Sequence, residues 1–225
     1  MEKRQAFLFD LDGTLVDSVY QHVLAWRDAL DELGLELSVW RIHRKIGMSG
    51  GLFANALMRE TGNALSVEEA TRLRQLHAES YRQRAAQVRP LPGARDLLAF
   101  LSGMGVPWAI ATSGHLESAR HTIELLGVPE HVPIITRDLV AHAKPDPDLF
   151  LTAAERLGVD ITESVVVGDS VWDLLAARRA RALGVGLLSG GYGQDELERA
   201  GAYRVYEDPA DLHRHLDEVG IRASP

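Results

Sequence analysis

The amino-acid sequence predicts an α/β fold: a doubly wound, Rossmann-like parallel sheet with an inserted helical cap domain. From Pro90 onward, short β-branched or aliphatic runs alternate with amphipathic segments, which is typical of βα units around a parallel sheet. Residues 15–88 break that rhythm, because they hold several helical patterns in succession and no convincing strand. With 225 residues, 46% of them hydrophobic, the chain is long enough to bury a full core.

The predicted sheet is assembled from six short apolar segments, each followed by a turn. The segments between them predict helices, most of which end at a glycine that can adopt the left-handed conformation. Strands are expected in AFLFD (6–10), VPWAIATSG (106–114), VPIITRD (132–138), ESVVVGDS (163–170), VGLLSGG (185–191) and YRVYED (203–208). Helices are expected in GARDLLAFLSGMG (93–105), HLESARHTIELLG (115–127), PDPDLFLTAAERLG (145–158), VWDLLAARRARALG (171–184) and QDELERAG (194–201).

Two units are expected along the chain. Residues 1–14 and 89–225 form the α/β core, and residues 15–88 form the helical cap. The segments 13–17 and 86–92 are the candidate hinges between them, because they lie where the helical patterns begin and end.

The cap is expected to contain at least two well-marked helices. The first begins at Asp17 or Ser18, either of which can cap it, and ends at Gly34. A later helix begins at Ser66, which with Glu69 forms a possible capping box. The first helix carries an apolar stripe at three-four spacing, made of Val19, Val23, Trp26, Leu30 and Leu33.

Composition excludes several functional classes. The net charge of -8 and pI near 5.6 argue against nucleic-acid or anionic-membrane partners, because those need a basic surface. The absence of cysteine excludes disulfides, thiolate nucleophiles and cysteine zinc sites. The apolar run near the N-terminus is too short for a signal peptide or a membrane span. We expect a cytoplasmic protein, a monomer or homodimer, that acts on small molecules.

The first predicted strand runs directly into two carboxylates. Asp10 closes the strand and Asp12 lies two residues beyond it, so both can face one crevice while Gly13 allows a sharp turn. Two close carboxylates repel each other, and a cation removes that cost. The pair therefore predicts a hard oxygen site of the kind that Mg²⁺ prefers.

Three other strand ends carry matching groups, and in open parallel sheets the ends of the strands converge on one crevice. Thr112, Ser113 and Gly114 offer a hydroxyl and backbone N–H groups to a phosphate. Lys144 offers a compact positive charge before a proline-rich helix start.

Asp169 lies near the end of the segment ESVVVGDS, and Asp173 lies four residues later on the same side of the first helical turn. Together the two reinforce the predicted metal site. Asp173 is alternatively an ordinary first-turn acid that complements the helix dipole. The loop SGGYG (189–193) follows the wrong strand for a dinucleotide fingerprint and is interpreted as a plain loop.

These motifs together resemble the haloacid dehalogenase (HAD) superfamily of aspartate-dependent phosphohydrolases. They occur in the family's order: Asp10-x-Asp12-Gly13-Thr14, then Thr112, then Lys144-Pro145, then Gly168-Asp169-x-x-x-Asp173. The resemblance covers essentially the whole chain. The helical insertion after the first motif is similar to the subclass with a C1 cap, which includes phosphoglycolate phosphatases, sugar-phosphate phosphatases and beta-phosphoglucomutases.

The resemblance implies a role for each residue of the motifs. Asp10 would be the nucleophile that forms an aspartyl-phosphate, and Asp12 the general acid and base. Thr112, Ser113, Gly114 and Lys144 would bind the phosphoryl group. Magnesium would bind Asp10, the backbone carbonyl of Asp12, and Asp169, with Asp173 close by. The expected activity is Mg²⁺-dependent hydrolysis of a phosphoglycolate-like or sugar-phosphate-like monoester.

Two alternatives remain open at this stage. A phosphomutase of the beta-phosphoglucomutase type is favoured by SVYQHVLAWRDAL (18–30), which resembles the first cap helix of those enzymes. Gly50 stands where they carry an arginine for the distal phosphate, which favours hydrolysis. A non-catalytic binding protein has no need of a paired nucleophile and acid. The possible substrate contacts from the cap are His22, Arg44 and Lys45.

Overall fold

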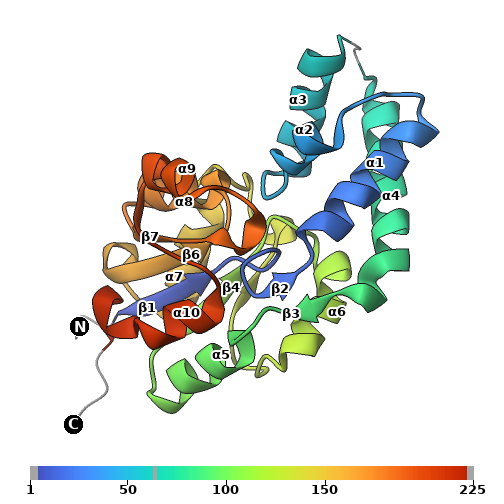
Figure 1. The fold of residues 1–225 in the computed structure, drawn as a ribbon. Helices are drawn as coiled ribbons and strands as arrows, with labels where there is room; N and C mark the ends of the chain where they lie inside the picture. Colours follow the sequence, from blue (N-terminus) through green and yellow to red (C-terminus); the bar gives the residue numbers. More distant parts are fainter. Residues whose placement is uncertain (1–4, 63–64, 222–225) are drawn as a thin grey trace.

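The computed structural model describes residues 5–62 and 65–221, and it confirms the predicted α/β class. Its main sheet has six parallel strands in the order β5-β4-β1-β6-β7-β8 (Figure 1). The strands are β1 (Ala6–Phe9), β4 (Trp108–Ala111), β5 (Ile134–Ile135), β6 (Ser164–Gly168), β7 (Leu183–Leu187) and β8 (Ala202–Tyr206). All six overlap the segments expected to form strands, although β7 begins two residues before its expected segment and β8 one residue before.

Helices cover both faces of this sheet, as a doubly wound fold requires. The side chains of Phe7 and Phe9 pack on one face with α5, α6 and α10, whereas Leu8 packs on the other with α7 and α8. Both faces are therefore apolar, which is why the strands contain continuous hydrophobic runs. The helices are α5 (Ala94–Gly103), α6 (Leu116–Leu126), α7 (Asp148–Leu157), α8 (Val171–Ala180), α9 (Gln194–Ala200) and α10 (Pro209–Arg214). Short 3₁₀ turns are η1 (Ala85–Gln87), η2 (Arg137–Leu139), η3 (Ile161–Glu163), η4 (Leu188–Gly190) and η5 (Leu216–Val219).

The predicted end of α8 is wrong by four residues. The sequence pattern extends that helix to Gly184, but it ends at Ala180, and Arg181 takes the left-handed conformation with φ 64°. Leu183 then begins β7, which pairs with β6 from Leu183 onward. The helix cannot extend to Gly184 because Leu183 and Gly184 pair with β6 in the sheet. Arg181 takes the left-handed conformation that was expected of a glycine at the helix end.

A separate helical unit stands to one side of the sheet, where α1 and α4 run alongside each other (Figure 1). Its helices bury their own apolar cluster, which contains the predicted stripe residues Val19, Val23, Trp26 and Leu30. The predicted capping box of α4 is present, with Glu69 N–H 3.1 Å from Ser66 Oγ and Ser66 N–H 2.7 Å from Glu69 Oε2. The four helices are α1 (Val19–Glu32), α2 (Val39–His43), α3 (Gly50–Thr61) and α4 (Val67–Arg84).

The chain enters and leaves this unit through a two-stranded antiparallel ladder. In it β2 (Val16–Asp17) pairs with β3 (Arg89–Pro90). The expectation that residues 15–88 hold no strand is therefore wrong for Val16 and Asp17. Both predicted hinge segments contribute a strand to the ladder, and we keep the division into a core and a cap at residues 14/15 and 88/89 as a proposal.

A second set of contacts joins the helical unit to the core, and we call residues 43–49 the docking segment. His43 Nε2 lies 2.8 Å from the carbonyl oxygen of Gly190. The Arg44 guanidinium lies 4.0 Å from the centre of the Tyr192 ring and forms an ion pair with Glu196 on α9. The backbone oxygen of Arg44 also accepts a hydrogen bond from Tyr192 Oη at 3.0 Å. These contacts hold the helical unit against the core on the side away from the ladder.

Removing the charge of Glu196, the core partner of Arg44, should increase the mobility of the docking segment alone. We expect Glu196→Gln to raise hydrogen exchange in residues 43–49 about three- to fivefold, because a partly exposed ion pair contributes ~1 kcal/mol or less. The matched control is Asp195→Asn, which breaks the Asp195–Arg199 pair on the exposed side of the same helix. Equal exchange in both variants, measured by mass spectrometry, would contradict the docking role.

Candidate active site

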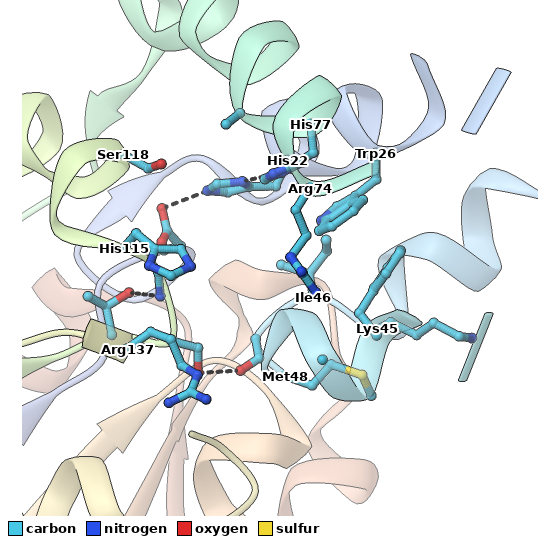
Figure 2. A pocket seen from close by; sticks show the side chains of 18 of the residues that line it. His22, Trp26, Lys45, Ile46, Met48, Arg74, His77, His115, Ser118 and Arg137 are labelled. Carbon is cyan, nitrogen blue, oxygen red and sulfur yellow. Dashed lines mark hydrogen bonds and ion pairs between the residues drawn. The ribbon is translucent and has the colours of Figure 1, made fainter. Parts of the chain in front are cut away.

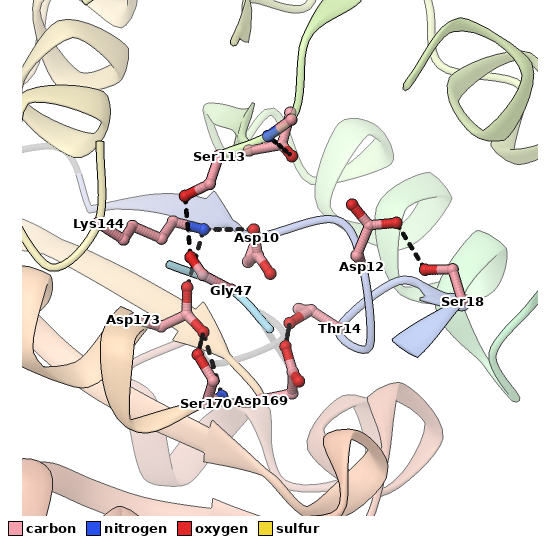
Figure 3. Close-up of polar contacts among 12 residues, drawn as sticks. Asp10, Asp12, Thr14, Ser18, Gly47, Ser113, Lys144, Asp169, Ser170 and Asp173 are labelled. Atoms are coloured by element: carbon pink, nitrogen blue, oxygen red, sulfur yellow. Dashed lines mark hydrogen bonds and ion pairs between the residues drawn. The ribbon is translucent and has the colours of Figure 1, made fainter. Parts of the chain in front are cut away.

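Three buried carboxylates and one buried lysine gather at the carboxyl end of the sheet (Figure 3). Lys144, whose side chain is fully buried, forms ion pairs with Asp10 and with Asp173, the latter at 2.8 Å from Asp173 Oδ1. Oxygens of Asp10, Asp169 and Asp173 all lie within 4.8 Å of one another. The structure thus brings together four residues that are up to 163 positions apart in the sequence.

Strand order explains how these residues meet. Asp10 follows β1 and Asp169 follows β6, which pairs directly with β1, and the Asp10 N–H donates to the Val167 carbonyl at 2.9 Å. Thr112 follows β4, the neighbour of β1 on its other side. The crevice beyond three central strands therefore receives all the motif residues, as expected for an open parallel sheet.

Glycines make room for the carboxylates. A Cβ on Gly190 would lie 1.8 Å from Asp169 Oδ2, and one on Gly13 would lie 2.5 Å from the same oxygen. A Cβ on Gly168 would lie 2.2 Å from the Asp173 Cβ. Gly13 also has φ 82°, a conformation that favours glycine. The loop SGGYG, interpreted from sequence as a plain loop, thus forms one wall of the carboxylate cluster.

The cluster carries more negative charge than Lys144 can balance. Burial raises the pKa of Asp10 to about 7, with a further contribution from Asp173, although the Lys144 ammonium opposes the shift. Burial, together with the charges of Asp173 and Asp10, raises the pKa of Asp169 well above its usual range. When all three carboxylates are ionised, one ammonium leaves two excess negative charges in a buried space, which is unfavourable without a counter-ion.

A divalent cation fits this arrangement. Its charge would balance the excess, and carboxylate oxygens are the ligands that hard cations prefer. Asp173 Oδ1 is buried and, although it pairs with Lys144, accepts no hydrogen bond from the described part of the chain. Asp173 Oδ2 accepts from the Ser170 N–H at 3.1 Å and from its hydroxyl at 2.5 Å. Asp173 is therefore both a helix-capping acid and a member of the charged cluster, so the two readings of it are compatible.

Asp12 lies apart from this cluster and faces the helical unit. Its Oδ1 accepts a hydrogen bond from Ser18 Oγ at 2.5 Å and lies 3.2 Å from His22 Nε2. Ser18, expected as a possible helix cap, makes no capping hydrogen bond and contacts Asp12 instead. Burial alone would raise the pKa of Asp12, but His22 and Ser18 outweigh it and lower the pKa. Asp12 is thus an ionised carboxylate in the free protein.

The predicted phosphate-binding residues Thr112, Ser113 and Gly114 already make hydrogen bonds within the protein. Gly114 N–H donates to Thr112 Oγ1 at 3.0 Å, and Ser113 Oγ donates to the Gly47 carbonyl at 2.9 Å. These bonds leave the Thr112 hydroxyl hydrogen and the Ser113 N–H as donors for a ligand. Ser113 therefore also ties the core to the docking segment.

A cavity of about 620 Å³ opens above Asp10 and Asp12, between the core and the helical unit (Figure 2). His22 and Lys45, two of the predicted cap contacts, line it, and Lys45 is held by an ion pair with Glu60 at 2.5 Å. Arg44 is absent from the described lining because it docks against α9. Further lining residues, none of which was among the predicted site residues, include Trp26, Met48, Phe53, Arg74, His77, His115 and Arg137.

Comparison with known proteins agrees with this geometry. A family model described as haloacid dehalogenase-like hydrolase matches residues 5–181. The chain belongs to that family. Hexitol phosphatase A from Escherichia coli K12 is 35% identical over 178 residues, which are 78% of this chain and 79% of that protein. The phosphoglycolate phosphatase of Neisseria meningitidis is 32% identical over 201 residues, covering 88% of this chain and 85% of its own.

The fold is shared with a crystal structure of a hydrolase from Pseudomonas syringae. That protein is 54% identical, with a TM-score of 0.94 over 96% of this chain and 99% of its own. The resemblance read from the four motifs is confirmed, and the relatives' names agree with the prediction of a phosphoric monoester hydrolase. None of the described helices has the length and apolar character that crossing a bilayer requires.

A single methyl group on Gly190 should disable the carboxylate cluster. We expect Mg²⁺ to raise the melting temperature of the wild-type protein and Gly190→Ala to abolish that rise, because the added Cβ would overlap the Asp169 carboxylate. The control is Gly193→Ala in the same loop, where a Cβ would meet only Glu196 Oε2 at 3.5 Å. If thermal denaturation shows the same Mg²⁺-induced shift in Gly190→Ala and wild type, Asp169 takes no part in metal binding.

Proposed function

We propose that the protein is a Mg²⁺-dependent phosphatase that hydrolyses a small phosphomonoester through a phosphoryl group carried on Asp10. The observation that carries this proposal is the contrast between two neighbouring aspartates at one cavity. Asp10 belongs to the charged cluster with Lys144, whereas Asp12 belongs to a hydrogen-bonded group from the helical unit. Separate environments for two carboxylates allow separate roles, one as nucleophile and one as acid and base.

The first step transfers the phosphoryl group to the protein. A carboxylate oxygen of Asp10 attacks phosphorus, the bond from phosphorus to the ester oxygen breaks, and Asp12 gives a proton to the departing oxygen. Lys144 and the donors of Thr112 and Ser113 stabilise the charge on the phosphoryl oxygens. The products of this step are an alcohol and an aspartyl-phosphate on Asp10.

The second step releases phosphate. Asp12, now a carboxylate, removes a proton from a water molecule, whose oxygen attacks phosphorus. The bond between phosphorus and the Asp10 oxygen breaks, which restores the carboxylate and frees inorganic phosphate. The lowered pKa of Asp12 in the free protein suits this basic role. For the first step the incoming phosphate raises that pKa, because its negative charge favours the protonated form.

Asp10, Asp169 and the backbone carbonyl of Asp12 are the proposed metal ligands, with Asp173 beside them. Mg²⁺ bound there would neutralise charge on the substrate phosphate and hold it near Asp10. The side chains of this chain do the remaining work: Lys144 screens the cluster, and Thr14 Oγ1 donates to Asp169 Oδ1 at 2.9 Å and fixes its orientation.

Hydrolysis is favoured over the phosphomutase alternative. A mutase must grip a second phosphate while its intermediate turns around, and Arg44 and Lys45 were the candidate groups in the cap. Both are ion-paired, Arg44 with Glu196 and Lys45 with Glu60. Supplying that grip from either residue would require breaking its pair.

Replacing the nucleophile should separate activity from stability. We expect Asp10→Asn to lower the turnover rate by about 10³-fold or more, because an amide is a poor nucleophile. Without metal its melting temperature should be unchanged or higher, since the change removes one of the excess buried charges. More than a few per cent residual turnover in a folded variant would contradict the assignment of Asp10.

A panel of phosphomonoesters, assayed with Mg²⁺ and with EDTA, tests the function itself. We expect inorganic phosphate from at least one small ester, loss of activity in EDTA and recovery when Mg²⁺ is restored. With beta-glucose 1-phosphate and a trace of the bisphosphate, no glucose 6-phosphate should form. Isomerisation without phosphate release would identify a mutase, and full activity in EDTA would exclude the metal role.

A further inference from the structure

Asp12 is the near end of a chain of hydrogen-bonding groups that leads into the helical unit. Asp12 Oδ1 lies 3.2 Å from His22 Nε2 on α1, and His22 Nδ1 lies 3.2 Å from His77 Nε2 on α4. The hydrogen-bonding side chains therefore run from the core, through one helix, to a second helix. Figure 2 shows both imidazoles at the cavity wall.

Stacked aromatic rings hold the two imidazoles in place. The His22 ring lies 3.9 Å from the Tyr81 ring at an angle of 5°. The His77 ring lies 4.0 Å from the Trp26 ring at an angle of 16°, and Trp26 in turn stacks on Phe53. Stacking holds the planes of both imidazoles, and the contacts of His22 with Asp12 and His77 determine which ring edge faces which group.

The protonation pattern follows from the acceptor at one end. A carboxylate oxygen accepts, so the 3.2 Å contact between Asp12 Oδ1 and His22 Nε2 places a His22 hydrogen on Nε2. Burial lowers the pKa of His77 well below its usual range, so His77 is neutral and has one ring hydrogen. When His22 is neutral too, its Nδ1 can only accept, so a His77 hydrogen on Nε2 points at Nδ1 and keeps the His22 hydrogen on Nε2.

We propose that His77 is a positioning residue for the proton transfer at Asp12, acting by fixing the tautomer of His22. Without His77, His22 can place its hydrogen on Nδ1 and turn a lone pair toward the carboxylate, which removes a hydrogen bond from Asp12. Because both histidines belong to the helical unit, the acid and base is complete only when that unit lies against the core. The kinetic part of this inference rests on the proposed function, and the tautomer part does not.

Leaving groups of different basicity separate this role from a purely structural one. An alkyl phosphate needs a proton on its departing oxygen, whereas p-nitrophenyl phosphate releases a stable anion that needs none. We expect His77→Phe, which keeps the stacking but removes the donor, to lower kcat for the alkyl ester about 10- to 100-fold with little change in KM. For p-nitrophenyl phosphate kcat should change by less than about threefold.

Two further variants bracket the result. His77→Gln retains a side-chain N–H near the Nε2 position and should recover most of the alkyl ester activity. His121→Phe, on an exposed part of α6, is the control for exchanging a histidine for a phenylalanine. Equal losses on both esters, no loss on either, or a Gln variant as impaired as the Phe variant would overturn the proposal.

A measurement without turnover keeps this inference separate from the function. Imidazole ¹⁵N chemical shifts in the full-length protein should show hydrogen on Nε2 of His22 in the wild type and a mixture of tautomers in His77→Phe. A His22 hydrogen on Nδ1 in the wild type, or an unchanged tautomer in the variant, would overturn the inference. Absence of phosphatase activity on every ester would contradict the proposed function and leave the tautomer result to be judged by itself.

Discussion

The burial of Lys144 among three carboxylates is the constraint on which the rest of the site depends. A buried ammonium is costly unless it is paired, and Asp10 and Asp173 together raise the pKa of Lys144 despite the opposing effect of burial. Pairing one ammonium with three carboxylates overshoots and leaves a negative space. That excess suits a divalent cation, and the cation together with Lys144 would supply the positive charge that a phosphate needs.

The two aspartates of the first motif belong to different parts of the molecule. The sheet fixes the position of Asp10, because β1 lies between β4 and β6 and brings Asp10 to Lys144 and Asp169. The helical unit fixes the environment of the Asp12 carboxylate, through contacts with Ser18 and His22 at the start of α1. In the proposed mechanism, nucleophilic attack therefore depends on the core, whereas proton transfer depends on how the helical unit is seated. The docking segment and the two-stranded ladder fix that seating from two sides.

The sheet and the motif residues were predictable because strand patterns and short motifs are local in sequence, and topology brings the ends of parallel strands together. Other features depend on pairs that no local pattern reveals. Arg44 meets Glu196 across 152 residues, and Gly190 meets Asp169 only after η4 folds back. His77 lies between the buried residues Leu73 and Tyr81 on α4, and only the i, i+4 relation of His77 to Tyr81, and of His22 to Trp26, hinted at stacked rings. The end of α8 was set by sheet register, which overrode helical periodicity.

The central claim is that a phosphoryl group passes through Asp10. The most direct test is to mix the Asp12→Asn variant with p-nitrophenyl phosphate and Mg²⁺, quench it in acid within one turnover, and digest it for mass spectrometry. We predict the mass of one phosphoryl group on the peptide that contains Asp10, because this leaving group departs without a proton from Asp12, whereas hydrolysis of the intermediate still needs the missing base. Phosphate release with no modified peptide at any quench time, or a phosphoryl group on another residue, would contradict it.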